Sequence, residues 1–384
     1  MDVLYSGFDG LDLALKFNIG GDFAAYLEAK QKEAAAARYD VPGEWEGETF
    51  TVASTGGQGG YAFRLDTGLT DEVWFLKRPN ARDPWGVRVS AKSAALLAHG
   101  LDGWQRKMEA TALAFGAEPI PRTTSIARID LAVDILAPDF ELDDDAFVMH
   151  SRSNRKAIKE IIQTNGRSGR LTSVTIGKMP GRQVILYDKR EEVLTKRKVE
   201  WPLVWNARRR QLGQPDLDFS DADSSRVWRV EVRAGKHHLK KHWGVTGWGD
   251  LHTSLPHMLE TTRDVVRYCA PSPDSNRSRW PIHELWSVAQ TELLDRLALR
   301  PPCIDPVTIR HETALDKIEV LTSQCTGILI GIAALKGVEA SHFQTFLAET
   351  TTRVSNNVQY HPQPLQDRLA RAADRYASLT QDQR

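Results

Sequence analysis

A period of two residues in the hydrophobic pattern over 128–135 predicts a strand, which we expect to span residues 125–136. Successive side chains of a strand point to opposite faces of its sheet. The apolar residues therefore share one face, and the other face holds Arg128, Asp130, Ala132 and Asp134. Aspartate is depleted inside strands, so two carboxylates on one face indicate a functional surface, with a solvated outer face as the alternative.

Two later segments show the same pattern, with an apolar back and a charged front. Tyr187 lies near the end of the first, and Glu231 lies between Arg229 and Arg233 in the second. These segments are 183–188 and 226–233. Three such strands predict one sheet with a functional face.

The rest of the chain predicts a β-rich unit, a mixed middle and a helical tail. A short strand or turn begins the chain, and Gly56–Gly60 predicts a hairpin turn, since its spacing fits no nucleotide-binding fingerprint. Further strands are expected over 48–54, 61–67, 72–77, 85–92 and 172–176. Helices are expected over 22–38, 103–115, 156–163, 189–211 (interrupted at Pro202), 251–269, 286–300, 307–336, 340–353 and 363–379.

This order of elements predicts an α+β fold. We expect a mostly antiparallel sheet with the active site on one face and helices on the other, plus a helical C-terminal region. Three regions are expected: a β-rich N-terminal half over 1–120, a catalytic half over 121–270 and the helical region over 271–384.

Composition narrows the class of protein. The 384 residues are 41% hydrophobic and 26% charged, as in ordinary globular proteins. No apolar run approaches the ~20 residues of a membrane helix, and Cys325–Leu335 is the longest candidate. Acidic residues precede the first lysine, unlike a targeting peptide. Three cysteines without metal-site spacing predict buried free thiols and a cytoplasmic protein with no membrane partner.

Charge is balanced overall but placed unevenly. Residues 101–150 hold 4 Lys/Arg against 10 Asp/Glu, and residues 151–200 hold 13 against 5. Acidic and basic clusters side by side suit a site that grips phosphate and holds a metal cation. The alternative is a set of solvated faces whose charges average out.

The residues on the predicted functional face suit phosphodiester transesterification. A metal held by carboxylates polarises the phosphate, and a tyrosine hydroxyl attacks phosphorus to form a covalent link to DNA. The segments Arg128-Ile-Asp-Leu-Ala-Val-Asp134, Gly177-Lys-Met-Pro-Gly-Arg-Gln-Val-Ile-Leu-Tyr-Asp-Lys189 and Trp228-Arg-Val-Glu-Val-Arg233 resemble, in order, the signature of the Rep_trans replication initiation factors of plasmids and filamentous phages. The resemblance covers roughly residues 120–240.

The resemblance implies a rolling-circle initiator that nicks one origin strand through a 5′-phosphotyrosine link and then religates it. Tyr187 takes the place of the nucleophile, and Asp130, Asp134 and Glu231 take the acidic positions. A His-hydrophobe-His motif is missing, so the resemblance implies carboxylate ligands and Mg²⁺ or Mn²⁺. Asp130 and Asp134 lie about 13 Å apart on a regular strand, so we expect Asp130 and Glu231 at the metal, with Asp134 in a supporting role.

Basic residues around these motifs are expected to contact DNA. They are Arg128, Lys178, Arg182, Lys189, Arg190, Arg208, Arg209, Arg210, Arg229 and Arg233. Trp201 and Trp205 lie between basic clusters, a pattern that suits single strands through base stacking; the alternative is that these tryptophans pack on the protein body.

Other functions remain open at this point. A relaxase that nicks a transfer origin would use the same chemistry, and a non-catalytic DNA-binding regulator could share the fold. A tyrosine recombinase is disfavoured because its tyrosine belongs to a helical domain. Origin DNA, double- and single-stranded, and a host helicase are the expected partners, and a homodimer is an open alternative to a monomer.

Overall fold

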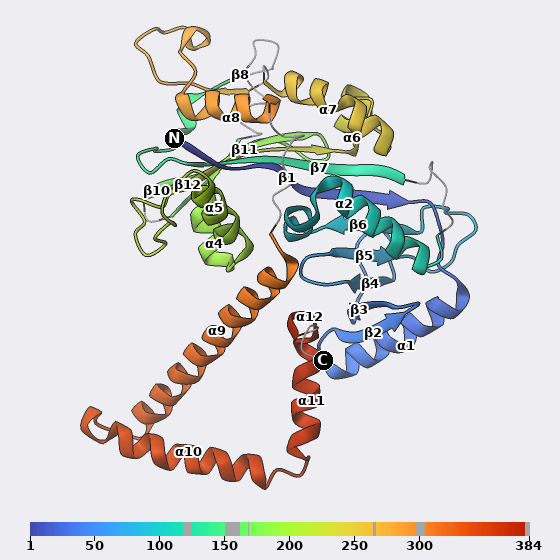
Figure 1. Cartoon of the computed structure of the whole chain (residues 1–384), viewed down its shortest axis with the longest axis vertical. Helices are drawn as coiled ribbons and strands as arrows, with labels where there is room; N and C mark the ends of the chain where they lie inside the picture. The colour runs from blue at the N-terminus through green and yellow to red at the C-terminus, as the bar shows by residue number, and fades with distance from the viewer. Residues whose placement is uncertain (118–123, 150–161, 168, 264–265, 296–303, 381–384) are drawn as a thin grey trace.

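An antiparallel sheet of 11 strands forms the centre of the molecule in this computed structural model (Figure 1). The structure describes residues 1–117, 124–149, 162–167, 169–263, 266–295 and 304–380. Across the sheet the strands follow the order β2-β3-β4-β5-β6-β1-β7-β12-β11-β10-β9. Their bounds are β1 (Asp2–Leu15), β2 (Val41–Trp45), β3 (Glu48–Val52), β4 (Phe63–Asp66), β5 (Glu72–Leu76), β6 (Val87–Ala91), β7 (Thr124–Leu136), β9 (Ile162–Arg167), β10 (Arg170–Gly177), β11 (Arg182–Asp188) and β12 (Val227–Gly235). A small separate sheet pairs β8 (Phe147–Met149) with β13 (Val266–Tyr268).

Helices cover both faces of the large sheet, and most of the core lies on one of them. This back face packs against α1 (Gly21–Ala37), α2 (Ser93–Ala114), α6 (Lys236–His242), α7 (Trp248–Arg263) and α8 (Glu284–Asp295). On the opposite side, called the front face here, α4 (Lys189–Lys196) and α5 (Glu200–Gln211) bury a smaller apolar cluster around Trp201 and Trp205. The antiparallel sheet with its helices confirms the α+β prediction, but α4 and α5 also cover part of the front face, where sequence analysis expected no helices.

The first strand differs most from its prediction as a short strand or turn. β1 spans 14 residues and pairs with β6 on one side and β7 on the other, so it joins strands β2–β6 to strands β7 and β9–β12 in one sheet. Its register with β7 shifts at three places. Such irregularities break the alternation of apolar residues, and this hid a long central strand from sequence analysis.

Two helix predictions were wrong in their details. The basic helix over 189–211 breaks at Arg197, which takes a left-handed conformation (φ 52°), and Pro202 instead lies in the first turn of α5, where its missing N–H costs little. The helix expected up to residue 269 ends at Arg263, before β13. Most of the predicted helix 156–163 lies outside the described residues, and its last two residues belong to β9.

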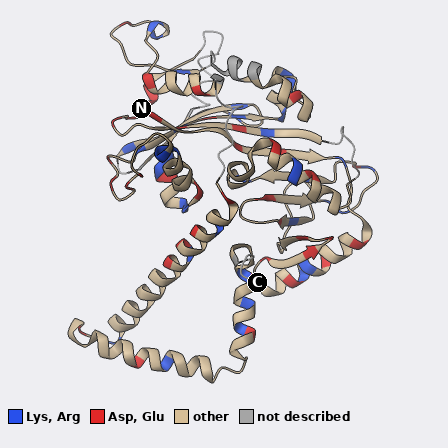
Figure 2. Cartoon of the chain, viewed as in Figure 1, with Lys and Arg blue, Asp and Glu red and all other residues tan. Residues whose placement is uncertain are grey.

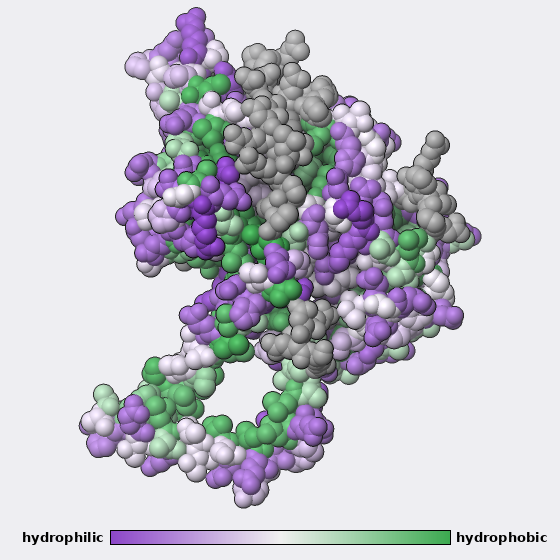
Figure 3. Space-filling model, in the orientation of Figure 1, coloured by the Kyte–Doolittle hydropathy of each residue, from purple (hydrophilic) through white to green (hydrophobic). Residues whose placement is uncertain are grey.

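The C-terminal region confirms the predicted helices and adds one unexpected property. After α9 (Pro306–Leu335) come α10 (Phe343–Gln359), α11 (Leu365–Arg375) and α12 (Ala377–Thr380). Because α12 packs back on α9, these helices form a loop around an open centre (Figure 1). Figure 2 shows few charges toward the end of α9, and Figure 3 shows hydrophobic atoms along the inner side of the loop.

By length and composition alone, α9 could cross a membrane, with a mean hydropathy of 1.6 over its best 18-residue window. The prediction that no such segment exists was wrong by this measure. The Thr, Ser and Gln residues that interrupt the apolar run are uncharged, so the mean hydropathy of the helix stays high. The predicted burial of the thiols holds for Cys269 but not for Cys325, which lies exposed on this helix, and Cys303 lies outside the described residues.

Candidate functional site

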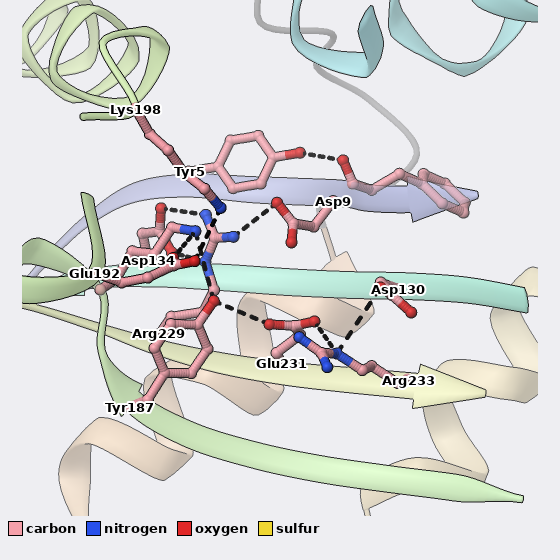
Figure 4. A network of polar contacts seen from close by, with 12 residues as sticks. Tyr5, Asp9, Asp130, Asp134, Tyr187, Glu192, Lys198, Arg229, Glu231 and Arg233 are labelled. Carbon is pink, nitrogen blue, oxygen red and sulfur yellow. Dashed lines mark hydrogen bonds and ion pairs between the residues drawn. The ribbon is translucent and has the colours of Figure 1, made fainter. Parts of the chain in front are cut away.

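The front face of β7, β12 and β11 brings the predicted chemical residues together (Figure 4). Residues directly opposite one another on paired antiparallel strands share a face. Tyr187 lies opposite Arg229, which lies opposite Asp134, and the row containing Arg233 and Asp130 lies four residues along. Glu231 lies between these two rows.

Tyr187 points its hydroxyl at Glu231. The hydroxyl donates a hydrogen bond of 3.0 Å to Glu231 Oε2, and Lys189 Nζ lies 3.5 Å from the Tyr187 hydroxyl oxygen. Burial, which outweighs the neighbouring Arg229, raises the pKa of Tyr187 well above its usual value of 10.0. The phenol is therefore protonated at neutral pH, and a proton acceptor is in place beside it.

A fully buried lysine supports this tyrosine from the start of α4. Lys189 forms an ion pair of 2.6 Å with Glu192, whose carboxylate also binds Lys198 at 2.9 Å. Burial and the nearby Arg229 lower the pKa of Lys189. Burial alone would raise the pKa of Glu192, but Lys189 and Lys198 outweigh it and lower that pKa. Lys189 and Lys198 thus keep Glu192 ionised close to the Tyr187 phenol.

Two carboxylates on adjacent strands converge on one position. Arg233 donates from Nε to Glu231 Oε1, and the same Nε lies 3.8 Å from Asp130 Oδ2. Arg128 binds both oxygens of Asp130, from Nε to Oδ1 at 2.8 Å and from Nη2 to Oδ2. Burial raises the pKa of Asp130 to about 6, although Arg128 opposes this shift.

This donor set fits a hard divalent cation. Glu231 and Asp130 both face the position that the positively charged Arg233 Nε now occupies. One or two carboxylates, together with water and phosphate, are typical ligands of Mg²⁺. Among the described residues, three acidic side chains bring ligating atoms within 4.8 Å of one another only at Asp143, Asp144 and Asp145, which are all exposed and belong to another part of the chain.

Asp134 lies on the same front face as Asp130, in a buried ion cluster. Its two oxygens accept hydrogen bonds from Arg229 at 2.5 and 2.8 Å, and Trp205 donates another at 2.8 Å. Arg229 also contacts Asp9 of β1 at 2.7 Å, and its guanidinium lies 3.9 Å from the ring centre of Trp201. Asp134 and Arg229 are both fully buried.

Sequence analysis missed Asp9 and Tyr5, which β1 adds to this cluster. Burial raises the pKa of Tyr5, and Arg229 lowers the pKa of Asp9 against the effect of burial. An aspartate within an apolar stretch was the signal available at Asp9, but the irregular pattern of β1 concealed that the stretch is a strand.

The residues predicted to contact DNA fall into two groups. Lys178 and Arg210 are exposed, and Arg128, Arg182, Arg190, Arg208 and Arg233 are half-buried. Lys189, Arg209 and Arg229 are buried and occupied by protein partners, respectively Glu192, the Pro215 carbonyl and Asp134. Trp201 and Trp205 are fully buried, so they pack on the protein body and offer no stacking surface.

Comparisons with known proteins find likenesses among solved structures but none among sequences. No protein-family model matches the sequence, and no curated protein matches it. The structure is similar to that of a rolling circle replication initiator protein from Geobacillus stearothermophilus, with a TM-score of 0.38 and 14% sequence identity, over 77% of this chain and 97% of that chain. A likeness at this score does not by itself assign a function.

Proposed function

We propose that this protein is a rolling-circle replication initiator, a metal-dependent endonuclease and strand transferase that nicks one strand of origin DNA. The observation that carries the proposal is the hydrogen bond from the Tyr187 hydroxyl to Glu231, on a sheet face that also holds Asp130 and several arginines. The sequence resemblance of the same three strands to the Rep_trans signature supports it.

Tyr187 serves as the nucleophile and Glu231 as its base. The phenol proton passes to Glu231 Oε2 as the Tyr187 oxygen bonds to phosphorus, since that carboxylate already accepts the proton's hydrogen bond. The bond from phosphorus to the 3′ oxygen breaks, and that oxygen leaves as a hydroxyl with a proton taken from water. The 5′-phosphotyrosine link conserves the energy of the broken phosphodiester bond, so a 3′ hydroxyl can attack this link and religate the strand.

Lys189 and the arginines oppose negative charge in this reaction. Lys189 Nζ lies close enough to the Tyr187 oxygen to stabilise the phenolate that develops during attack. Arg233 and Arg128 are each about one-third exposed, so both can reach a bound phosphate. Arg229 is fully buried, and its contacts with Asp9, Asp134 and Trp201 hold β1, β7 and α5 together next to the site.

Asp130 and Glu231 would hold Mg²⁺ or Mn²⁺ in place of their contacts with Arg233. A cation bound there would polarise the scissile phosphate and screen its charge. Released from Glu231, Arg233 would be free to bind the DNA backbone. The origin duplex is the substrate, the displaced single strand is a product, and a host helicase in the cytoplasm would extend the opening.

A supercoiled plasmid carrying the DNA that flanks this gene provides the test. With Mn²⁺, the protein should relax the plasmid and leave a protein–DNA adduct that survives denaturation. Tyr187→Phe keeps the packing of the ring but lacks the nucleophile, so it should abolish nicking and adduct while leaving duplex binding intact. Normal nicking by this variant would refute the assignment, and specific binding without nicking by the wild type would instead favour a regulator.

A further inference from the structure

The N-terminal half carries a cluster of aromatic and basic side chains on the same front face as Tyr187. Across β6, β5 and β4, Arg88 lies opposite Phe75, which lies opposite Arg64. The alternate residues of these strands, such as Trp74, are buried on the back face. Phe75 and Arg88 are only half-buried, so both reach the surface.

Arg88 lacks the partner that a half-buried cation normally has. Its guanidinium carbon lies 4.1 Å from the ring centre of Phe75 and 5.7 Å from that of Tyr61. No carboxylate among the described residues forms an ion pair with it, and its Nε is buried without a hydrogen-bond partner there. An arginine held over aromatic rings without an anion is poised to receive a phosphate or a base.

The glycine-rich turn between β3 and β4 fixes this cluster in place. A Cβ atom at Gly57 would lie 2.6 Å from Phe75 Cδ1, so only glycine lets the turn approach the ring. Tyr61, which follows the turn, packs edge-on against Phe75 with ring centres 6.1 Å apart, and Lys77 Nζ lies 5.0 Å from the Tyr61 ring centre. The cluster is therefore preorganised, and its side chains lose little freedom on binding.

A line of arginines connects this cluster to the proposed active site. Arg233 of β12 and Arg128 of β7 lie on the front face, and Arg128 lies opposite Asp12 of β1, two residues from the position opposite Arg88. The strands lie next to one another in the sheet (Figure 1). From strand spacing and rise, Tyr187 and Phe75 are roughly 40 Å apart along this diagonal.

We infer that the cluster formed by Tyr61, Phe75, Lys77 and Arg88 is a binding site for single-stranded DNA. Bases stack on the aromatic rings and on the Arg88 guanidinium, and Arg88 neutralises a phosphate. Lys77 is paired with Asp83 at 2.6 Å and borders the Tyr61 ring. Such platforms bind all sequences alike because every base has a stacking face. That the bound strand is the one joined to Tyr187 rests on the proposed nicking function, whereas the binding itself does not.

The test measures binding of a fluorescent oligothymidine of about 16 nucleotides to the full chain by anisotropy. Arg88→Ala and Tyr61→Ala should each weaken binding on the order of 10-fold, and Tyr61→Phe, which keeps the ring, should bind like the wild type. Arg88→Ala should also lower the slope of log affinity against log salt by about 0.7, the value for one lost phosphate contact with a single strand.

Arg106→Ala provides a matched control, because it removes an exposed arginine from α2 on the back face. Wild-type affinity in both Arg88→Ala and Tyr61→Ala would overturn the inference, as would an equal loss for a duplex of the same length. If Arg88 matters for the oligothymidine but the wild type never nicks the plasmid, the proposed nicking function fails and this inference stands.

Discussion

Asp134→Ala tests whether this carboxylate stabilises the fold or binds the metal. Asp134 is fully buried and receives three hydrogen bonds, two from Arg229 and one from Trp205. Without it, the buried Arg229 keeps only Asp9 as an anionic partner. The Trp205 N–H loses its acceptor in an apolar cluster.

Removing one partner of a buried ion pair costs about 3–5 kcal/mol, because the other charge stays buried. An unpaired buried donor adds about 1–3 kcal/mol, while Asp9 offsets part of the loss at Arg229. We therefore expect Asp134→Ala to lower the free energy of unfolding by about 3–5 kcal/mol. At a denaturant slope of about 3 kcal/mol/M, the urea midpoint falls by about 1–1.7 M.

Urea unfolding followed by tryptophan fluorescence measures this change, and Asp216→Ala is the matched control. Asp216 accepts from Nε and Nη2 of Arg210 in the same forked arrangement, but on the surface, so its loss should leave the midpoint unchanged. Equal midpoints for the two variants would refute the argument from burial. A changed Mn²⁺ requirement in folded Asp134→Ala would return this residue to the metal site.

Three further predictions concern the site and the core. Asp130→Asn and Glu231→Gln should each reduce nicking and raise the Mn²⁺ concentration required; titration curves like that of the wild type would exclude both as ligands. Lys189→Met should lower the rate of adduct formation more than oligonucleotide affinity, and an equal loss of both would assign Lys189 to DNA binding alone. Glu72 accepts from the indoles of Trp74 and Trp104, and its burial raises its pKa above 4.5. Folding therefore favours its protonated form, so stability should fall as pH rises from about 4.5 through the raised pKa. Glu72→Gln should remove this fall in urea unfolding measured across that range, and an unchanged pH dependence would contradict the assignment.

Local sequence was enough to predict the strands that carry the chemistry. A period of two residues is set by the backbone of each strand, so β7, β11 and β12 and their charged sides follow from the alternation alone. The same pattern placed Asp130 and Glu231 on the charged side of their strands before any pairing was known. The α+β class and the helical C-terminal region also followed from the order of such segments.

Tertiary structure decided which of these residues meet and what each can do. The contact between Asp134 and Arg229 joins residues 95 positions apart, and only the pairing of β7 with β12 creates it. Pairing of β1 with β7 adds Asp9, and folding of α4 and α5 onto the sheet buries Lys189, Trp201 and Trp205. Periodicity cannot show these outcomes, because the neighbour of a side chain across a sheet, and its exclusion from water, depend on segments that are distant in the chain.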